Sequence, residues 1–341
     1  MRSTRPSFLL GLSLGLILSG SVVHAAGTPA GIAEGWAPGL AFGAKQGRLS
    51  LEKVRDLPGE GPAAFHPQRR LLAWSDGIRV RVELPEGGNG FLYTADGWLS
   101  DLAFGRDGTL WLALGGDLVR IEEGREVCRA RQSGVSRLVP GPAQGIAGLA
   151  EATLGGSGPS GRVVLVLPDC QSQAGAWEAG PLTALAYEAN GKLVARGRGP
   201  AYSLAIEPAV APPPTVELLG PEGAVKARLP LFDGSRIEAL VAHGSWLLAL
   251  SALGEWQLLS RRDLTPSAAG RFADGRRALP LPDTDLVAVG DGWIDLTRGV
   301  ALPGRLPAAA SATAPDGSWW VLEQPEGRSV WRLAPGKGRR R

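Results

Sequence analysis

The chain has 341 residues with 36 basic and 33 acidic side chains, but six of the basic residues lie at its two ends. Removing Arg2, Arg5, Lys337 and Arg339–Arg341 leaves 30 basic residues against 33 acidic ones, so the body of the chain is slightly acidic. A nucleic-acid-binding domain carries a basic face, and this balance gives no sign of one. We therefore expect no nucleic-acid partner.

The first 26 residues have the pattern of a cleaved signal peptide. Two arginines start the segment, FLLGLSLGLIL (Phe8–Leu18) is apolar, and the small residues Val23 and Ala25 precede a cleavage point. A membrane anchor is the alternative, but the apolar run is shorter than the roughly 20 residues that a span needs. We therefore expect a periplasmic or secreted protein with no transmembrane segment after cleavage.

An internal repeat follows the N-terminal region. Residues 65–82 (FHPQRRLLAWSDGIRVRV) and 102–124 (LAFGRDGTLWLALGGDLVRIEEG) both have the pattern strand, turn, strand, glycine turn, strand. An offset of 39 residues aligns Phe65 with Phe104. Further copies of the pattern are recognisable at 136–170, 182–197, 240–261, 279–299 and 314–333.

The spacing of the copies predicts the fold. Their first turns lie about 41 residues apart, and a period of this size with about four strands is typical of propeller blades. Helical repeats are excluded because the apolar runs favour β-branched and aromatic residues and are often cut by glycine. We therefore predict an all-β fold, a seven-bladed β-propeller. Six or eight blades are alternatives, because residues 200–235 hold one strand too many for a regular blade.

The chain has two cysteines, Cys128 and Cys170. In an exported protein, two cysteines most simply form one disulfide. The bond would close a loop of about 40 residues and contribute roughly 3–4 kcal/mol to stability by restricting the unfolded chain. A pair of buried free thiols is the alternative.

The last blade predicts how the ring closes. It supplies three strands, near 309–314, 318–323 and 328–334, and a missing outer strand would leave an unpaired edge. The segment GRLSLEKVRDL (47–57) resembles a strand but has no blade of its own. We predict that it completes the last blade by pairing with Ser329–Leu333. The expected organisation is a signal peptide (1–26), a lead-in (27–46), one propeller domain (47–335) and a basic tail (336–341).

The segment LSDLAFGRDGTLWLALGGDLVRIEEG (99–124) resembles the propeller repeat of sensor domains in bacterial two-component regulators and, more loosely, NHL-type repeats. The shared features are an apolar entry strand, an Asp-Gly turn, Leu-Trp, and a Gly-Gly turn. The resemblance covers about three blades, the first, second and last. It implies a propeller used for recognition and assigns no binding residues. The chain lacks the histidine kinase and DNA-binding parts that accompany such sensor domains.

Common catalytic motifs are missing from the sequence. The chain that remains after signal cleavage has two histidines, His66 and His243, both at predicted first turns, and it contains no G-x-S-x-G nucleophile motif. Zinc needs three or four clustered ligands, which these scattered residues do not offer. GSGPSG (156–161) matches the glycine pattern of dinucleotide sites, but a strand follows it where a helix is required. We expect a hairpin loop there, and no cofactor, metal or catalytic residue.

The sequence thus favours an exported recognition or scaffold module for another envelope protein, a glycan or a small ligand, acting as a monomer and without enzymatic activity. The alternative is a lactonase-like hydrolase or quinoprotein-like oxidoreductase with its site in the central channel. Asp101 and Asp107 are its candidate carboxylates, although an Asp-Gly turn also explains Asp107. Unpaired charges converging in the channel would favour an enzyme, whereas a small or apolar lining would favour binding.

Overall fold

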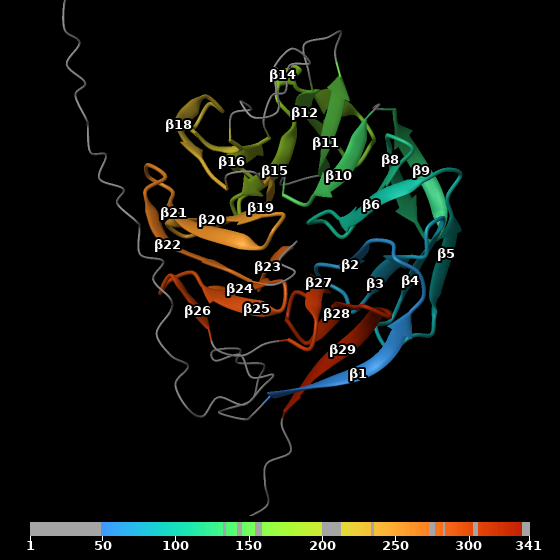
Figure 1. Ribbon diagram of the computed structural model, residues 1–341. Helices are drawn as coiled ribbons and strands as arrows, with labels where there is room; N and C mark the ends of the chain where they lie inside the picture. Colours follow the sequence, from blue (N-terminus) through green and yellow to red (C-terminus); the bar gives the residue numbers. More distant parts are fainter. Residues whose placement is uncertain are drawn as a thin grey trace, which may run out of the picture. The chain divides into compact units, whose positions relative to one another are not determined.

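The computed structural model describes residues 49–131, 134–141, 145–153, 159–199, 213–232, 235–272, 277–281, 284–302 and 306–335. All of them belong to one compact unit, Ile32–Arg341. Over these residues the chain forms 29 strands and no helix, and the strands make seven antiparallel sheets around a ring (Figure 1). The predicted seven-bladed, all-β propeller is confirmed.

The first three blades follow one another along the chain, each built from consecutive strands. Blade 1 contains β2 (Ala63–Phe65), β3 (Leu72–Ser75), β4 (Arg79–Glu83) and β5 (Gly90–Thr94). Blade 2 contains β6 (Leu99–Phe104), β7 (Leu110–Leu114), β8 (Asp117–Glu122) and β9 (Arg125–Ala130). Blade 3 contains β10 (Val135–Val139), β11 (Ile146–Thr153), β12 (Pro159–Val166), β13 (Ser172–Ala174) and the short β14 (Glu178–Ala179), which also pairs with β12.

The next three blades have the same order. Blade 4 contains β15 (Leu182–Tyr187), β16 (Leu193–Arg198), β17 (Thr215–Leu219) and β18 (Val225–Pro230). Blade 5 contains β19 (Ile237–His243), β20 (Trp246–Ser251), β21 (Glu255–Ser260) and β22 (Pro266–Arg271). Blade 6 contains β23 (Ala278–Pro280), β24 (Leu286–Val289), β25 (Gly292–Asp295) and β26 (Val300–Leu302). The extra strand suspected within 200–235 is not present among the described residues of that range, where β17 and β18 complete a regular blade.

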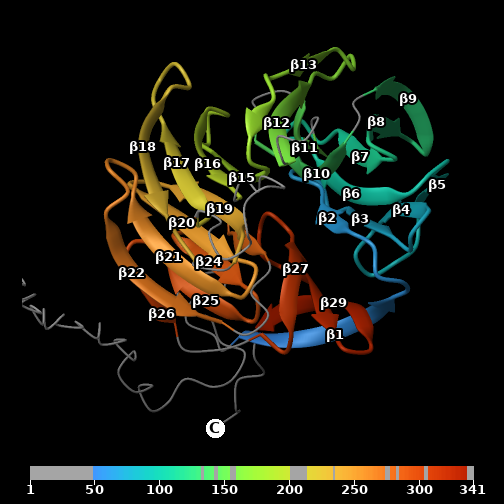
Figure 2. The same ribbon diagram turned by 45° about the horizontal axis from the view of Figure 1, so that its top comes forward.

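Blade 7 closes the ring with strands from both ends of the chain. It contains β27 (Ala309–Thr313), β28 (Trp319–Gln324) and β29 (Gly327–Pro335), and β1 (Leu49–Leu57) lies along β29 as the outer strand (Figure 2). The ladder runs from Leu49 opposite Pro335 to Leu57 opposite Arg328, with one irregularity between Lys53 and Arg55. The predicted closure is therefore confirmed, and the ladder is longer than the sequence indicated.

Seven apolar clusters hold the blades together, one at each junction between neighbouring blades. Tryptophans at the starts of the second or third strands fill several of these junctions. Trp111 and Trp320 are fully buried, and the ring of Trp320 meets that of Trp293 edge to face at 5.3 Å. Such large aromatic contacts between rigid sheets fix the radius of the ring and so the width of its centre.

Among the described residues, no helix is long and apolar enough to cross a lipid bilayer. The expected signal peptide (1–26), lead-in (27–46) and basic tail (336–341) lie outside the described residues.

Candidate functional site: the central channel

The first strand of every blade faces the centre of the ring, so these seven strands form the wall of a channel. At one end of the channel the first strands begin; we call this the strand-start end. At the other end they turn back into the second strands, and we call this the first-turn end. Two cavities occupy the channel and share Asp101 and Arg277 in their walls.

A β-bulge recurs near the start of the first strand in five blades. The strand pairing skips one residue in each case: Ser100, Ser136, Thr183, Glu238 and Ser311. In two of the blades the skipped serine donates its hydroxyl to the second strand, from Ser100 to the Ala113 carbonyl at 3.1 Å and from Ser311 to the Val321 carbonyl at 3.4 Å. A bulge re-aims neighbouring side chains and carbonyls, here at the wall of the channel.

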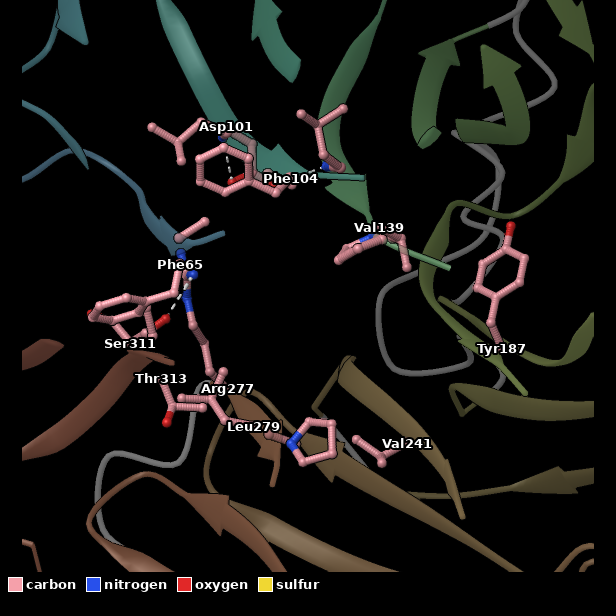
Figure 3. A pocket seen from close by; sticks show the side chains of 18 of the residues that line it. Phe65, Asp101, Phe104, Val139, Tyr187, Val241, Arg277, Leu279, Ser311 and Thr313 are labelled. Atoms are coloured by element: carbon pink, nitrogen blue, oxygen red, sulfur yellow. Dashed lines mark hydrogen bonds between the residues drawn. The ribbon is translucent and has the colours of Figure 1, made fainter. Parts of the chain in front are cut away.

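The first-turn end of the channel is mainly apolar. Its cavity has a volume of about 450 Å³. Figure 3 shows Phe65, Phe104, Val139, Tyr187 and Leu279 around this space, with Asp101 of blade 2 and Arg277 of blade 6 at separate places on its wall. Burial raises the pKa of Tyr187 to about 12, so its phenol stays neutral at physiological pH.

The strand-start end is larger and carries most of the charge. Its cavity has a volume of about 760 Å³ and reaches Arg137, Glu238 and Glu323 as well as the two shared residues. Alanines from the first strands fill much of the remaining wall. The channel therefore has an apolar half and a charged half.

Arg137 and Glu238 form an ion pair that crosses from blade 3 to blade 5. The other terminal nitrogen of Arg137 donates to two bulge carbonyls, Thr183 at 2.9 Å and Glu238 at 2.8 Å. Glu238 also accepts from Arg236 at 2.9 Å. Because both charges are paired and hydrogen-bonded, this pair braces three blades and leaves little bonding capacity for a ligand.

Asp101 lies in the channel wall, as the sequence interpretation required of a site residue. One of its carboxylate oxygens accepts the Leu102 N–H at 2.9 Å, and the other accepts the Leu138 N–H of blade 3 at 2.8 Å. Burial raises the pKa of Asp101, although the charges of Arg277 and Arg137 and the two backbone hydrogen bonds oppose the shift. The carboxylate thus ties blade 2 to blade 3 and still faces the cavity.

Arg277 enters the channel from blade 6. Its guanidinium donates to the Ser311 carbonyl, another bulge position, at 3.1 Å. Among the described residues, no carboxylate lies within ion-pair distance of Arg277. It is the largest opposing charge felt by Asp101, yet the two groups are not paired.

Hydrogen bonds between loops frame the first-turn end. Arg106, from the first turn of blade 2, donates to the carbonyls of Glu188 and Ala189 in the first turn of blade 4. Gln68 of blade 1 donates to the Arg106 carbonyl, and Arg261 of blade 5 pairs with the Glu188 carboxylate. These contacts link four blades around the channel mouth and hold its shape.

The histidines of the described chain have structural surroundings. His66 Nδ1 accepts the backbone N–H groups of Gln68 and Arg69, both at 3.0 Å, and burial followed by the charge of Arg69 lowers its pKa. His243 Nε2 lies 2.7 Å from the Asp285 carboxylate on the exposed turns of blades 5 and 6. Neither residue lines either of the two channel cavities.

Asp107 has the role expected of a turn residue. The Asp107 carboxylate accepts the Thr109 backbone N–H at 3.0 Å and its hydroxyl at 2.8 Å, which fixes the Asp-Gly turn. Asp107 lines neither of the two channel cavities. In the glycine motif GSGPSG (156–161), residues 159–161 belong to the strand β12 and residues 156–158 lie outside the described residues, so the hairpin loop expected there stays a prediction. Within the described residues, no group of three or more histidine, cysteine or carboxylate side chains is placed to hold a metal ion.

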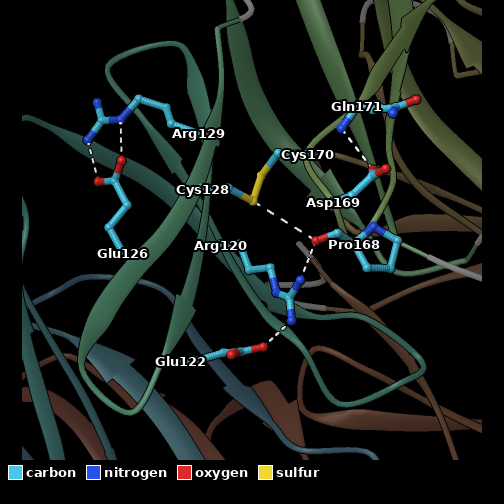
Figure 4. The surroundings of a disulfide bond; sticks show 9 residues. All are labelled: Arg120, Glu122, Glu126, Cys128, Arg129, Pro168, Asp169, Cys170 and Gln171. Atoms are coloured by element: carbon cyan, nitrogen blue, oxygen red, sulfur yellow. Dashed lines mark hydrogen bonds and ion pairs between the residues drawn. A yellow bond between two sulfur atoms is a disulfide. The ribbon is translucent and has the colours of Figure 1, made fainter.

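Cys128 and Cys170 form a disulfide between β9 of blade 2 and the turn after β12 of blade 3 (Figure 4). The bond joins residues 42 positions apart. Beside it, Arg120 donates to the Pro168 carbonyl and pairs with Glu122. The disulfide lies at the outer rim of the ring, away from the channel.

Sequence reasoning missed Arg137, Glu238 and Arg277. A signal for two of them was present in the repeat, because the bulged strands share an apolar residue followed by Ser, Thr or Glu: LSD, VSR, LTA, IEA and ASA at 99, 135, 182, 237 and 310. Aligning the copies on this triplet places Asp101 and Arg137 at equivalent positions, and Glu238 at the bulge itself. Arg277 lies in a blade outside this pattern.

No family model and no curated protein matches this chain. Among solved structures, one described as "Structure of Dos1 propeller" is similar, with a TM-score of 0.56 and 14% sequence identity. The match covers 81% of this chain and 77% of that one. At this identity the likeness shows the fold alone, so the narrower resemblance to two-component-regulator or NHL-type repeats stays a prediction. The comparison and the seven sheets thus agree that the chain is a β-propeller.

Proposed function

We propose that this chain is an exported binding module that recognises a protein, a glycan or a small ligand through the channel of its propeller. The observation that carries the proposal is the channel wall, which combines a small and apolar lining with a few charged groups on a rigid frame. Ligand sites are typically concave and mostly apolar, with a small number of placed polar groups. The loops that frame the first-turn end supply further contact surface.

Export is supported by two independent features. The first 26 residues have the pattern of a signal peptide, and the Cys128–Cys170 disulfide is of the kind that persists in oxidising compartments. We therefore propose that the mature chain begins near residue 27 and works in the periplasm or outside the cell. Sequencing the N-terminus of protein isolated from the envelope fraction tests this, and an intact first residue would contradict it.

The test of the binding role compares a blocked channel with an open one. We would purify C-terminally tagged protein from its native envelope, identify whatever co-purifies, and repeat this with Ala278→Trp, which fills the channel wall. Ala301→Trp, at an exposed position on the outer strand β26, is the matched control. A partner or ligand kept by the wild type and the control but lost by Ala278→Trp supports the proposal. A partner kept equally by Ala278→Trp and Ala301→Trp would show that the binding surface lies outside the channel.

The enzyme alternative rests on Asp101 and Arg277, two channel charges that are not paired with each other, and on the raised pKa of Asp101. Each of its oxygens accepts a backbone N–H, so a bracing role between blades accounts for the residue without catalysis. Metal and quinone analysis of the same purified material separates the two functions. Stoichiometric Ca²⁺ or a quinone with no other ligand would favour the lactonase-like or quinoprotein-like alternative.

A further inference from the structure

Arg277 has bonding capacity that the described protein does not use. A guanidinium carries five N–H donors, and one of its terminal nitrogens donates to the Ser311 carbonyl. Arg137, in the same channel, instead bonds two carbonyls and a carboxylate. A cation with spare donors in the wall of a cavity is suited to a carboxylate, which guanidinium binds through two parallel hydrogen bonds.

Asp101 supplies the opposite charge across the same space. Its two oxygens each accept one backbone hydrogen bond, and an ionised carboxylate has about four acceptor sites in all. Asp101 and Arg277 line both cavities, and no ion pair joins them. A ligand between them can therefore accept from Arg277 and donate to Asp101 at once.

The charges in the channel select against ligands with a single charge. A simple anion that pairs with Arg277 meets Asp101, and Glu323 faces the same cavity. A simple cation that pairs with Asp101 meets Arg277. A ligand that carries both an ammonium and a carboxylate group satisfies each residue and leaves the net charge of the site unchanged.

The apolar half of the channel indicates the chemistry of the uncharged part of the ligand. Phe65, Phe104 and Leu279 line the adjoining cavity of about 450 Å³, which starts at the same two charged residues. Its walls offer apolar surface for an aliphatic or aromatic group attached to the charged part. An α-amino acid with an apolar side chain, or a short peptide of such residues, has this combination of groups.

We propose that the channel binds a small zwitterion of this kind, with its carboxylate on Arg277, its ammonium on Asp101 and its apolar part towards Phe65 and Phe104. This inference rests on the proposed function, in that it names the ligand class of the same channel. It does not depend on which larger partner the propeller engages.

The experiment uses four defined probes and calorimetric titration of the mature protein. L-Leucine and L-leucyl-L-leucine carry both charges, N-acetyl-L-leucine keeps the carboxylate alone, and L-leucinamide keeps the ammonium alone. We expect the protein to bind at least one of the two zwitterions. Its affinity for N-acetyl-L-leucine and for L-leucinamide should be about tenfold or more lower, because each of these probes loses a charge-assisted hydrogen bond. Comparing leucine with the dipeptide distinguishes a free amino acid from a peptide as the source.

Two variants test which residue binds the carboxylate of the probe and which binds its ammonium. Arg277→Met should weaken the zwitterion about tenfold or more and remove the preference over leucinamide. Asp101→Asn should weaken it similarly and remove the preference over N-acetyl-leucine. Arg298→Met, an exposed arginine paired with Asp295 on blade 6, is the matched control and should bind like the wild type. If Asp101→Asn fails to fold, the probe series on the wild type and Arg277→Met still decides.

Several outcomes overturn the inference. They are no binding of either zwitterion, tight binding of a blocked form, or unchanged binding in Arg277→Met. A partner captured from the envelope and lost in Ala278→Trp, together with no zwitterion binding, would refute the ligand class and leave the proposed function standing. If Ala278→Trp does not weaken zwitterion binding, the channel is not the zwitterion site, and this result would contradict the inference.

Discussion

Arg328 on β29 donates to the Ser75 carbonyl on β3 at 2.7 Å, although 253 residues separate the two in sequence. The same guanidinium donates to the carbonyls of Gly59 at 3.1 Å and Pro58 at 3.3 Å, and also to that of Gly61. The side chain is buried, and burial lowers its pKa. Through these hydrogen bonds, Arg328 of blade 7 binds blade 1 and the connection from β1 to β2. They reinforce the ladder between β1 and β29 that closes the ring.

Replacing Arg328 should therefore loosen the closure. Arg328→Met keeps the length and apolar stem but leaves four carbonyls without their donor, which should lower the free energy of unfolding by about 3 kcal/mol. Urea denaturation followed by tryptophan fluorescence measures the change. Arg332→Met is the control on the same strand, because its exposed ion pair with Glu52 should contribute less than about 1 kcal/mol. Equal losses of unfolding free energy in Arg328→Met and Arg332→Met would contradict the role of Arg328 in ring closure.

The disulfide makes a separate contribution to stability. Replacing both Cys128 and Cys170 with serine removes a cross-link between positions 42 residues apart, which corresponds to about 4 kcal/mol of unfolding free energy in the chain-entropy description. The same urea experiment measures it. Reduction should destabilise the wild type by a similar amount and have no effect on the double variant. An unchanged midpoint for the reduced wild type would show that the rim contacts alone hold blades 2 and 3 together.

The ring could be predicted from the sequence because its determinants are local and repeated. The Asp-Gly turn at Asp107 and the glycine turns recur at one period, and each of them dictates a chain reversal without help from the rest of the fold. The closing strand could be predicted by counting, since the last repeat lacked one strand and 47–57 had no blade.

The chemistry of the channel could not be predicted in the same way. Arg137 and Glu238 meet because blade 4 brings blades 3 and 5 to one wall, and no local pattern encodes a contact across 101 residues. Asp101 was placed correctly in the channel, whereas its backbone partner Leu138 belongs to the next blade. Contacts between blades depend on the radius of the ring, which the packing of large side chains decides.

The aromatic junction between blades 6 and 7 should be one of the costliest to disrupt. Trp320 is fully buried, its indole N–H donates to the Gly317 carbonyl at 2.8 Å, and its ring contacts Trp293. Trp320→Ala should lower the unfolding free energy by about 3–5 kcal/mol. Trp98→Ala is the matched control, because that ring is 74% exposed and should cost little. A similar loss in both variants would argue against tryptophan packing as the link between blades.

Blades 3 and 4 are joined by a network of ion pairs in addition to their apolar cluster, and this network should make stability sensitive to acid. The nearly buried Glu217 of β17 accepts from Arg196 at 2.6 Å and from Arg198 at 3.3 Å, and both arginines also bind Glu178 of β14. Burial alone would raise the pKa of Glu217, but the hydrogen bond from Arg196 and the charges of Arg198 and Arg196 outweigh it and hold the pKa below its usual value.

Because the pKa of Glu217 is lower in the folded than in the unfolded chain, the unfolded chain takes up the proton first as the pH falls. The stability that this carboxylate supplies is complete above the unfolded pKa of about 4.3 and is lost as the pH drops through the folded value. Glu217→Gln should cost about 3 kcal/mol at neutral pH, since it removes a buried carboxylate from the partly buried Arg196 and Arg198 and leaves them paired with Glu178. The variant and the wild type should converge in acid. Urea midpoints measured from neutral to acid pH test this, with the exposed Glu52→Gln as control. A constant gap between wild type and Glu217→Gln at every pH would contradict the assignment of the acid response to Glu217.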